Sequence, residues 1–311
     1  MIDQYLQPLA HGITLSCRSA GKKGRPVLIF LHGFPEAAFV WDELLQHFAK
    51  FENGGYRCVA PNLRGFEQSS APTDVSAYRP KHLVQDIAAL IAIEGSQIDC
   101  LVAHDWGGAV AWNLAASQPQ LIKKLAIINS PHPGTFLREL QHSAAQQTAS
   151  AYMNFLIRPD AEALLAEDDF RRWFAFFVSF GAAKDAKGSS VAPAWLTDAA
   201  RQQYRAVWQI SLTGALNFYR ASPLRPPRPG PPHHDPAAAG VVIPRTLLDV
   251  LVPTLVLWGM GDIALPPALL DGLADYVPNM QLEKIEGATH WIVHEQPELV
   301  MKLLHQFLKA S

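Results

Sequence analysis

The sequence predicts an α/β fold in which helices cover both faces of a mostly parallel sheet. Short runs of β-forming residues alternate with longer helical patterns, as they do when each strand returns through a helix. Most of these runs are apolar throughout, which is typical of strands buried on both faces. The alternation stops after about residue 130 and resumes near residue 250. We therefore expect one core built from residues 1–130 and 250–311, with a helical lid inserted over residues 131–249.

The core elements can be placed by residue number. Strands are expected at residues 13–18, 27–31, 57–61, 98–104, 124–129, 254–258 and 281–285, of which the last five are short apolar runs. Helices are expected at residues 41–51, 81–93, 107–116 and 297–308. The expected strands and helices alternate along the chain, as they do in an α/β sheet.

Two features of the expected lid stand out. Phe170, Trp173, Phe174 and Phe177 recur at spacings of three and four, so they share one helix face. We interpret this face as packing of the lid against the core, with direct contact to substrate as the alternative. Residues 222–240 are rich in proline and cannot form a helix interior or a central strand. An extended excursion over the surface is expected there.

Composition narrows the possible partners and compartment. The net charge is −2 and no basic face is clustered, so neither nucleic acid nor an anionic membrane is an expected partner. The amino terminus lacks a signal-peptide pattern and no apolar run approaches membrane-spanning length. Cys17, Cys58 and Cys100 are far apart and have no metal-ligand spacing. We expect a cytoplasmic protein with buried thiols, no metal, no cofactor and a small apolar substrate, as a monomer or a homodimer.

The segment DCLVAHDWGGAVAW, residues 99–112, carries the most specific pattern. An apolar strand leads into Ala103, His104, Asp105, Trp106 and Gly107, and a helix begins at Gly107. This small-x-nucleophile-x-small arrangement is the nucleophile elbow of the α/β-hydrolase fold, where a sharp turn lifts the central side chain above the strand ends. Small residues are needed because the turn presses the strand against the helix. The sequence therefore predicts an α/β-hydrolase fold.

The side chain at this elbow is a carboxylate, which changes the chemistry. Aspartic acid, with a reference pKa of about 3.9, is ionised at neutral pH and needs no base to attack. Attack on an acyl carbon would give an anhydride, so the sensible target of Asp105 is a saturated carbon that bears a leaving group. The product is an ester of Asp105, and water activated by a general base must cleave it. The alternative is that Asp105 only caps the helix.

Two later residues complete a triad in the order nucleophile, acid, histidine. Asp262 follows a glycine-rich turn after the strand at 254–258, and His290 lies on a loop before the last helix. Both arrive after strand carboxyl ends, where sites of such sheets lie. His290 is expected to take a proton from water while Asp262 fixes its tautomer. Each could instead be structural, and His294 is the competing histidine.

An oxyanion site is expected beside the nucleophile. His32, Gly33, Phe34 and Pro35 follow the strand at 27–31, and the backbone N–H groups of Phe34 and Trp106 are the natural donors to the oxyanion of ester hydrolysis. The Phe34–Pro35 bond can be cis, since only X–Pro bonds reach that geometry at low cost. An ordinary strand-to-helix turn is the alternative.

Several motifs together resemble the soluble epoxide hydrolase branch of the α/β-hydrolases. They are HGFPE at residues 32–36 with a following tryptophan, HDWGG at 104–108, NSPHP at 129–133, GALNFYR at 214–220 and GATHW at 287–291. The resemblance covers nearly the whole chain and implies hydrolysis of epoxides to diols. HDWGG alone is shared with haloalkane dehalogenases, so the lid has to decide. The departures are the long proline-rich run and Phe218, where tryptophan is frequent.

The resemblance implies that two lid tyrosines face the nucleophile. Tyr219 falls on the LN-aromatic-YR motif, and Tyr152 falls on the tyrosine position of an early lid helix. An opened epoxide leaves as an alkoxide, which needs a proton, and a phenol with a pKa of about 10 can donate one. Filling of the lid core is the alternative role. The residues expected to line the substrate pocket are Phe34, Trp106, Met153 and Trp291.

Two rival functions remain open. A haloalkane or haloacetate dehalogenase would use the same aspartate, but Phe34 stands where haloalkane dehalogenases commonly carry a polar donor. The arginines that hold a carboxylate substrate in fluoroacetate dehalogenases are replaced by Trp106 and Ala109. A hydrolase-fold receptor that binds a small apolar ligand without turnover is the second rival, and the complete triad argues against it.

Overall fold

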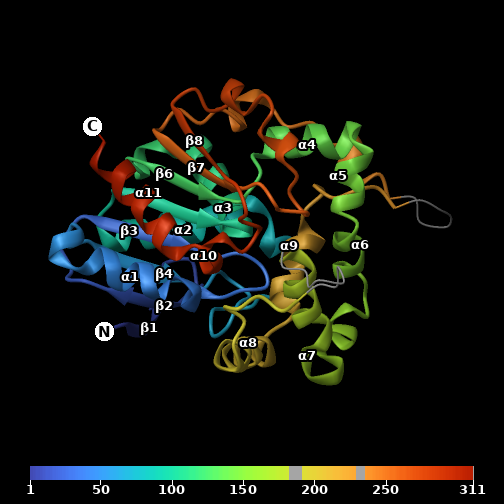
Figure 1. Cartoon of the computed structure of the whole chain (residues 1–311), viewed down its shortest axis with the longest axis horizontal. Helices are drawn as coiled ribbons and strands as arrows, with labels where there is room; N and C mark the ends of the chain where they lie inside the picture. The colour runs from blue at the N-terminus through green and yellow to red at the C-terminus, as the bar shows by residue number, and fades with distance from the viewer. Residues whose placement is uncertain (182–190, 229–234, 311) are drawn as a thin grey trace.

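The computed structural model describes residues 1–181, 191–228 and 235–310. It contains a sheet of eight strands in the order β1-β2-β4-β3-β5-β6-β7-β8. The strands from β4 onward in this order pair in parallel, whereas β2 pairs antiparallel with both β1 and β4. The predicted α/β-hydrolase fold with a mostly parallel sheet is thereby confirmed. Figure 1 shows helices on both faces of this sheet.

The strands are short and lie close to the predicted positions. They are β1 Asp3–Pro8, β2 Thr14–Ala20, β3 Val27–Leu31, β4 Arg57–Pro61, β5 Cys100–His104, β6 Leu125–Ile128, β7 Thr254–Gly259 and β8 Met280–Ile285. The prediction missed β1, an edge strand whose sequence DQYLQP leaves most side chains exposed or half-buried. Such a strand carries no buried apolar run. The strand predicted from residue 98 begins at Cys100, because Ile98 forms only an isolated bridge to Ile122.

Alternate side chains of each central strand enter different layers of the core. In β3, Val27, Ile29 and Leu31 join one apolar cluster, and Leu28 and Phe30 join the other. The first layer is covered by α2 (Pro80–Glu94) and α3 (Asp105–Ser117), and the second by α1 (Asp42–Ala49), α10 (Ile292–Glu295) and α11 (Pro297–Lys309). This period-two pattern is the pleat of the sheet.

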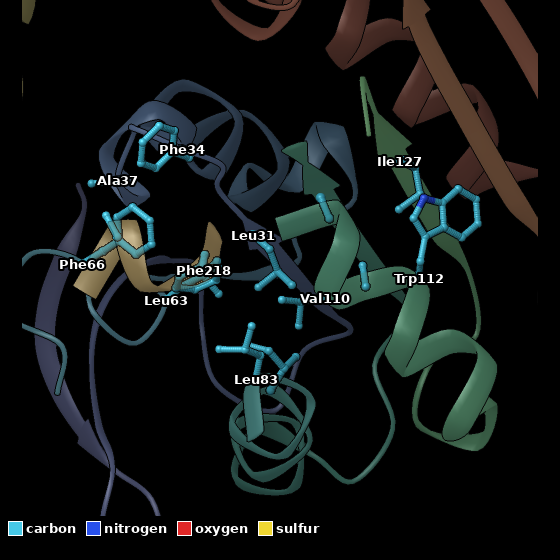
Figure 2. Packing of buried hydrophobic residues seen from close by; sticks show 14 of the residues in the cluster. Leu31, Phe34, Ala37, Leu63, Phe66, Leu83, Val110, Trp112, Ile127 and Phe218 are labelled. Atoms are coloured by element: carbon cyan, nitrogen blue, oxygen red, sulfur yellow. The ribbon is translucent and has the colours of Figure 1, made fainter. Parts of the chain in front are cut away.

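Figure 2 shows the first layer from close by, with Leu83 of α2 and Val110 of α3 pointing toward Leu31 of β3. All three side chains are at most 4% exposed. Burying one such side chain contributes about 2 kcal/mol to folding. The helix that begins at Asp105 is therefore held firmly against the strands that precede it.

Between β6 and β7 the described residues form helices and loops. The helices are α4 Pro133–His142, α5 Ala144–Ala149, α6 Tyr152–Leu156, α7 Ala161–Phe180, α8 Asp198–Ile210 and α9 Thr213–Ala221. Of the short 3-10 helices, η5 Ala237–Gly240 and η6 Arg245–Leu247 lie in this stretch. Those in the core are η1 Ala38–Trp41, η2 Phe51–Asn53, η3 Val75–Tyr78, η4 Pro119–Leu121, η7 Pro267–Leu270 and η8 Leu273–Asp275. Figure 1 shows α4 to α9 gathered on one side of the sheet. We call residues 131–249 the helical insertion.

The aromatic stripe of the insertion packs as a face. Phe170, Trp173, Phe174 and Phe177 are all buried in α7 and lie 5.1–6.0 Å, between ring centroids, from Trp208 of α8. The stripe also reaches the core, because the Trp173 ring lies 5.0 Å from that of Phe34. Packing is thus the observed role of this stripe. The helix is kinked where Phe170 and the residues just before it leave helical geometry.

Candidate active site

Asp105 sits on the sharp turn between β5 and α3. Its φ is +48°, a left-handed conformation that non-glycine residues adopt at a cost and that is common at functional sites. A Cβ on Gly107 would lie 2.5 Å from the carbonyl oxygen of Leu31, and one on Gly33 would lie 2.4 Å from the Cβ of Asp105. Both neighbours must therefore be glycine for the strand, the turn and the loop after β3 to meet. The helix begins at Asp105, two residues before the predicted start at Gly107.

The structure brings Asp105, His290 and Asp262 together. His290 Nδ1 lies 2.7 Å from Asp262 Oδ2, which is a hydrogen bond. His290 Nε2 lies 3.7 Å from Asp105 Oδ2, which is too long for one. The side chains of His290 and Asp262 are 6% and 0% exposed, and that of Asp105 is 15% exposed. Asp262 therefore fixes the Nδ1 side of the His290 ring, whereas Nε2 faces Asp105 without a hydrogen bond to it.

Asp262 is held by neighbours that leave it little freedom. Its Oδ1 accepts hydrogen bonds from the backbone N–H groups of Ala264 and Leu265, and its Oδ2 accepts one from Asn129 Nδ2 at 2.8 Å. The Oδ1 of Asn129 in turn accepts the N–H of Gly259 at 2.9 Å. Sequence reasoning gave Asn129 no role, although it begins the NSPHP motif. The Asn129 amide thus joins the end of β6 both to the last residue of β7 and to Asp262.

The loop after β3 supplies a backbone donor to the carboxylate of Asp105. The N–H of Phe34 donates to Asp105 Oδ1 at 2.7 Å, and the Phe34–Pro35 peptide bond is cis, as the sequence allowed. The N–H of Trp106 belongs to the first turn of α3, where backbone donors have no acceptor within the helix. The Phe34 N–H therefore lies at the carboxylate, and the Trp106 N–H remains the predicted second donor.

The two tyrosines lie on short helices of the insertion, Tyr152 on α6 and Tyr219 on α9. The ring of Tyr219 lies 5.0 Å from that of Trp106 and 4.7 Å from that of Phe34. The rings of Tyr152 and Tyr219 are 6.2 Å apart. Burial first, and then the charge of Asp105, raise the pKa of Tyr152; burial and the charges of Tyr152 and Asp105 likewise raise the pKa of Tyr219. Both phenols are therefore protonated and lie within the electrostatic influence of the nucleophile.

A cavity of about 680 Å³ opens beside Asp105, a size typical of small-molecule sites. It lies between the core and the helical insertion. Its lining residues are Arg79, Pro80, Asp105, Trp106, Ala109, Asn113, Ser130, Pro131, Pro133, Phe136, Tyr152, Met153, Arg220, Ala221, Ser222, Pro223, Leu224, Arg225, Val241, Ile243, Leu247 and Leu265. Most of them are apolar, so the cavity suits a largely apolar molecule.

Comparison with known proteins agrees with this architecture. Residues 26–297 match the family model described as alpha/beta hydrolase fold. The chain belongs to the α/β-hydrolase family. It is 33% identical to the AB hydrolase superfamily protein YfhM of Bacillus subtilis, over 96% of each chain. It is 31% identical to Epoxide hydrolase 4 of Homo sapiens, over 99% of this chain and 79% of that one.

Solved structures lead to the same family. An epoxide hydrolase from metagenomes of hot environments superposes with a TM-score of 0.83 at 32% identity, over the whole of both chains. The epoxide hydrolase of Bacillus megaterium, solved with an inhibitor, superposes with a TM-score of 0.82 at 27% identity, over 98% of this chain and all of that one. The helical insertion is thus within the matched length of both.

The residues expected in the pocket of this α/β-hydrolase divide into two groups. Trp106 and Met153 line the cavity, and so does Tyr152. Phe34 and Trp291 are not among the lining residues; both are buried, and the Trp291 ring packs against Phe177 of the insertion at 4.7 Å. Trp291 thus supports the loop of His290 from behind.

The proline-rich run begins at the mouth of the cavity. Its residues 229–234 lie outside the described part of the chain, so the predicted excursion is described only at its two ends. At the first end, Ser222, Pro223, Leu224 and Arg225 line the cavity, and each of them is exposed or half-buried. Prolines exclude a helix interior there, but they do not decide which side of the chain faces the site.

A buried carboxylate that the sequence analysis missed lies behind the triad. Glu36, at 0% exposure, accepts a hydrogen bond from Tyr204 at 2.8 Å, and its Oε1 lies 2.5 Å from His294 Nε2. Its Oε2 lies 3.3 Å from His104 Nδ1. His294, the competing histidine, therefore pairs with Glu36 and not with Asp262. The HGFPE motif contains Glu36, but only the fold reveals its partners.

The charges around His290 set its protonation. Burial alone would lower the pKa of His290, but the charge of Asp262, its hydrogen bond and the charge of Asp105 outweigh burial and raise the pKa to about 9. The histidine is therefore a cation at neutral pH. Loss of the negative charge on Asp105 would make it a better base.

No metal site is evident in the part of the chain that the structure describes. Within it, no group of three or more His, Cys, Asp or Glu side chains is arranged to hold a metal ion. No helix within these same ranges has both the length and the apolar character needed to cross a bilayer. Cys17, Cys58 and Cys100 are buried thiols, as expected.

Proposed function

We propose that this α/β-hydrolase is an epoxide hydrolase that works through a covalent ester on Asp105. The observation that carries the proposal is a carboxylate at the nucleophile elbow with two phenols close by: Tyr152 lines the same cavity as Asp105, and the Tyr219 ring lies 5.0 Å from that of Trp106 and 6.2 Å from that of Tyr152. The epoxide hydrolases among its relatives support the same activity. A phenol is suited to an alkoxide leaving group, because an alkoxide needs a proton that a halide does not.

The first half-reaction opens the ring. Asp105 Oδ1 is held by the Phe34 N–H, so Oδ2 attacks a ring carbon and forms the new C–O bond. The C–O bond of the epoxide breaks, and its electron pair takes a proton from Tyr152 or Tyr219. The insertion that carries these tyrosines acts as a lid over the nucleophile. The product is an ester of Asp105 with a free hydroxyl on the neighbouring carbon.

The second half-reaction hydrolyses that ester. Esterification removes the negative charge of Asp105, so the pKa of His290 falls and His290 gives up its proton. That proton restores the phenol that was deprotonated in the first half-reaction, and the neutral imidazole can then take a proton from water. The resulting hydroxide attacks the Asp105 carbonyl carbon, and the oxyanion forms at Oδ1 beside the Phe34 and Trp106 N–H groups. The ester C–O bond then breaks, and the diol oxygen receives the proton from His290. The other proton of the attacking water is left on the Asp105 carboxyl group and passes to His290, which restores the starting charges. Asp262 keeps the imidazole oriented throughout.

A single turnover in ¹⁸O-water with enzyme in excess tests this route. Water enters the Asp105 carboxylate, so peptide mass analysis is expected to find the label on Asp105 and none in the first diol. Label found only in the diol would rule out the ester. Intact mass of His290→Gln mixed with epoxide is expected to show an adduct that Asp105→Asn lacks. Halide release from haloalkanes or haloacetates without diol formation would instead establish the dehalogenase alternative.

A further inference from the structure

Asn129 is a buried polar residue that the proposed chemistry leaves without a role. It directly follows β6 and begins the NSPHP motif. Its exposure is 0% and its φ is +39°, a left-handed conformation that asparagine tolerates better than most residues. Such conformations persist where the surroundings fix them, and they are concentrated at functional sites. We therefore examined what the Asn129 side chain does beside the catalytic triad.

The hydrogen bonds of Asn129 determine which way its amide points. The backbone N–H of Gly259 donates to it at 2.9 Å, so the accepting atom must be Oδ1. Its Nδ2 consequently faces Asp262 and donates to Oδ2 at 2.8 Å. An ionised carboxylate has no hydrogen to donate, so the opposite orientation would place one oxygen against another. Asn129 is thus a hydrogen-bond donor to the acid of the triad.

Asn129 and His290 share one oxygen of Asp262. Oδ2 lies 2.8 Å from Asn129 Nδ2 and 2.7 Å from His290 Nδ1. A hydrogen bond to an ionised carboxylate stabilises its charge, and the carboxylate then attracts the proton of a second donor less strongly. The amide of Asn129 therefore weakens the attraction between Asp262 and the imidazolium of His290.

Asp262 does not need Asn129 to stay in place. Its Oδ1 accepts hydrogen bonds from the backbone N–H groups of Ala264 and Leu265 at 2.9 and 3.0 Å. These two donors belong to the loop after β7 and hold the carboxylate from the side away from Asn129. Loss of the Asn129 amide is therefore expected to change the attraction between Asp262 and His290 and to leave the carboxylate where it is.

Charged and titratable groups face His290 from several elements of the core. They are Glu36 in the loop after β3, His104 at the end of β5, Asp105 on the turn into α3 and Asp262 in the loop after β7. The phenols of Tyr152 and Tyr219 face Asp105 from the insertion. Esterification removes the charge of Asp105 alone, so Asp262 remains beside the imidazole and still attracts its proton.

We propose that Asn129 is a positioning residue for the second half-reaction, and that its amide limits the attraction of Asp262 for the proton of His290. The inference rests on the proposed covalent ester. Once Asp105 is esterified, His290 must pass its proton to the phenolate left by ring opening before it can act as a base toward water. By stabilising the charge on Asp262 Oδ2, Asn129 lets this proton leave at neutral pH. Without the amide, the imidazolium would persist and the ester would accumulate.

Asn129→Gly tests this role, because glycine removes the amide and adopts a positive φ without strain. The matched control is Asn62→Gly. Asn62 is 1% exposed and follows a strand, β4; it accepts a backbone N–H, that of Ala38, at 2.7 Å and donates to Ser16 Oγ at 2.7 Å. Both variants thus lose a buried amide with one backbone and one side-chain partner, but only the first loses a contact to the triad. Asn129→Ala replaces the glycine variant if circular dichroism shows that the latter does not fold.

The measured quantity is the rate of ester hydrolysis as a function of pH, from stopped-flow single turnovers. We expect the rising limb of this profile to move about one unit to higher pH in Asn129→Gly, which lowers the rate about tenfold below the limb and leaves it within about twofold of the wild type above it. The limb of Asn62→Gly should stay where it is in the wild type. A purely structural role of Asn129 would lower the rate by the same factor at every pH and would overturn the proposal. So would a limb that stays in place or moves to lower pH in Asn129→Gly, or one that moves equally in Asn62→Gly.

NMR titration separates this inference from the proposed function, since it needs no turnover. Asp105→Asn carries an uncharged amide in place of the nucleophile, and adding Asn129→Gly to it should raise the pKa of His290 by about one unit. Such a rise in a protein that opens no epoxide would support the role of Asn129 and refute epoxide hydrolysis. Epoxide turnover with an unchanged pKa of His290 would refute the role of Asn129 and support epoxide hydrolysis.

Discussion

Replacing Asp105 by asparagine is expected to lower the pKa of His290. An amide is neutral and nearly the same shape as the carboxylate, so Asp105→Asn resembles the uncharged ester in charge. The charge removed lies 3.7 Å from His290 Nε2. Coulomb's law gives about 1 kcal/mol at this distance in water and about 4.5 kcal/mol at an effective dielectric constant of 20. At 1.36 kcal/mol per pKa unit, the pKa of His290 should fall from about 9 to between about 6 and about 8.

NMR titration of the histidine ring signals measures this change, with His290 assigned by comparison with His290→Gln. The control is Asp160→Asn, which removes an exposed carboxylate paired with Arg158 and should leave the pKa of His290 where it is. Intact mass must show that the introduced amide has not been hydrolysed back to aspartate, since it stands where the activated water attacks. If the pKa of His290 stays near 9 in Asp105→Asn, the charge of Asp105 does not control the basicity of His290, and the reasoning is refuted.

Other consequences follow from the same contacts. Tyr152→Phe and Tyr219→Phe should each lower kcat/KM for epoxides by about 10- to 100-fold, because each removes a proton donor. Stopped-flow kinetics measures the rate at which the epoxide alkylates Asp105, and an equal rate in the wild type and the double variant would disprove that role. Gly107→Ala should destabilise the protein by roughly 2–4 kcal/mol, because its Cβ would meet the Leu31 carbonyl oxygen at 2.5 Å, while Gly240→Ala, with open space around it, serves as the urea-unfolding control. The pKa of His290 is raised on folding, so His290 contributes on the order of 3 kcal/mol to the free energy of unfolding; this contribution is complete below about pH 6.5 and is lost as the pH rises through about 9. Urea unfolding at several pH values measures it. A free energy of unfolding that rises between about pH 6.5 and about 9 would contradict the prediction.

The sequence was most informative where function follows from local pattern. Asp105, Asp262 and His290 could be named because each stands just after a strand, and the carboxyl ends of parallel strands meet at one edge. The central strands could be placed because they are apolar throughout. The polar edge strand β1 could not, since its pattern does not differ from that of a loop.

Residues that act through distant partners escaped prediction. Glu36 pairs with His294 across 258 positions of sequence, and Asn129 with Asp262 across 133. No local spacing encodes such contacts. Arg225 was hidden for another reason, because a proline-rich segment indicates an irregular path without indicating which side chains turn inward.

In the proposed mechanism, the two half-reactions use different stretches of chain. Ring opening needs phenols carried by α6 and α9, whereas ester cleavage needs groups held by β5, by the loop after β3 and by the loops that follow β7 and β8. A chimera that receives another family member's residues 131–249 should therefore inherit the donor's choice of ring while keeping this enzyme's own rate of deacylation. Substitutions confined to the insertion could in this way alter which compounds are consumed during evolution, without any change in the residues that release the diol.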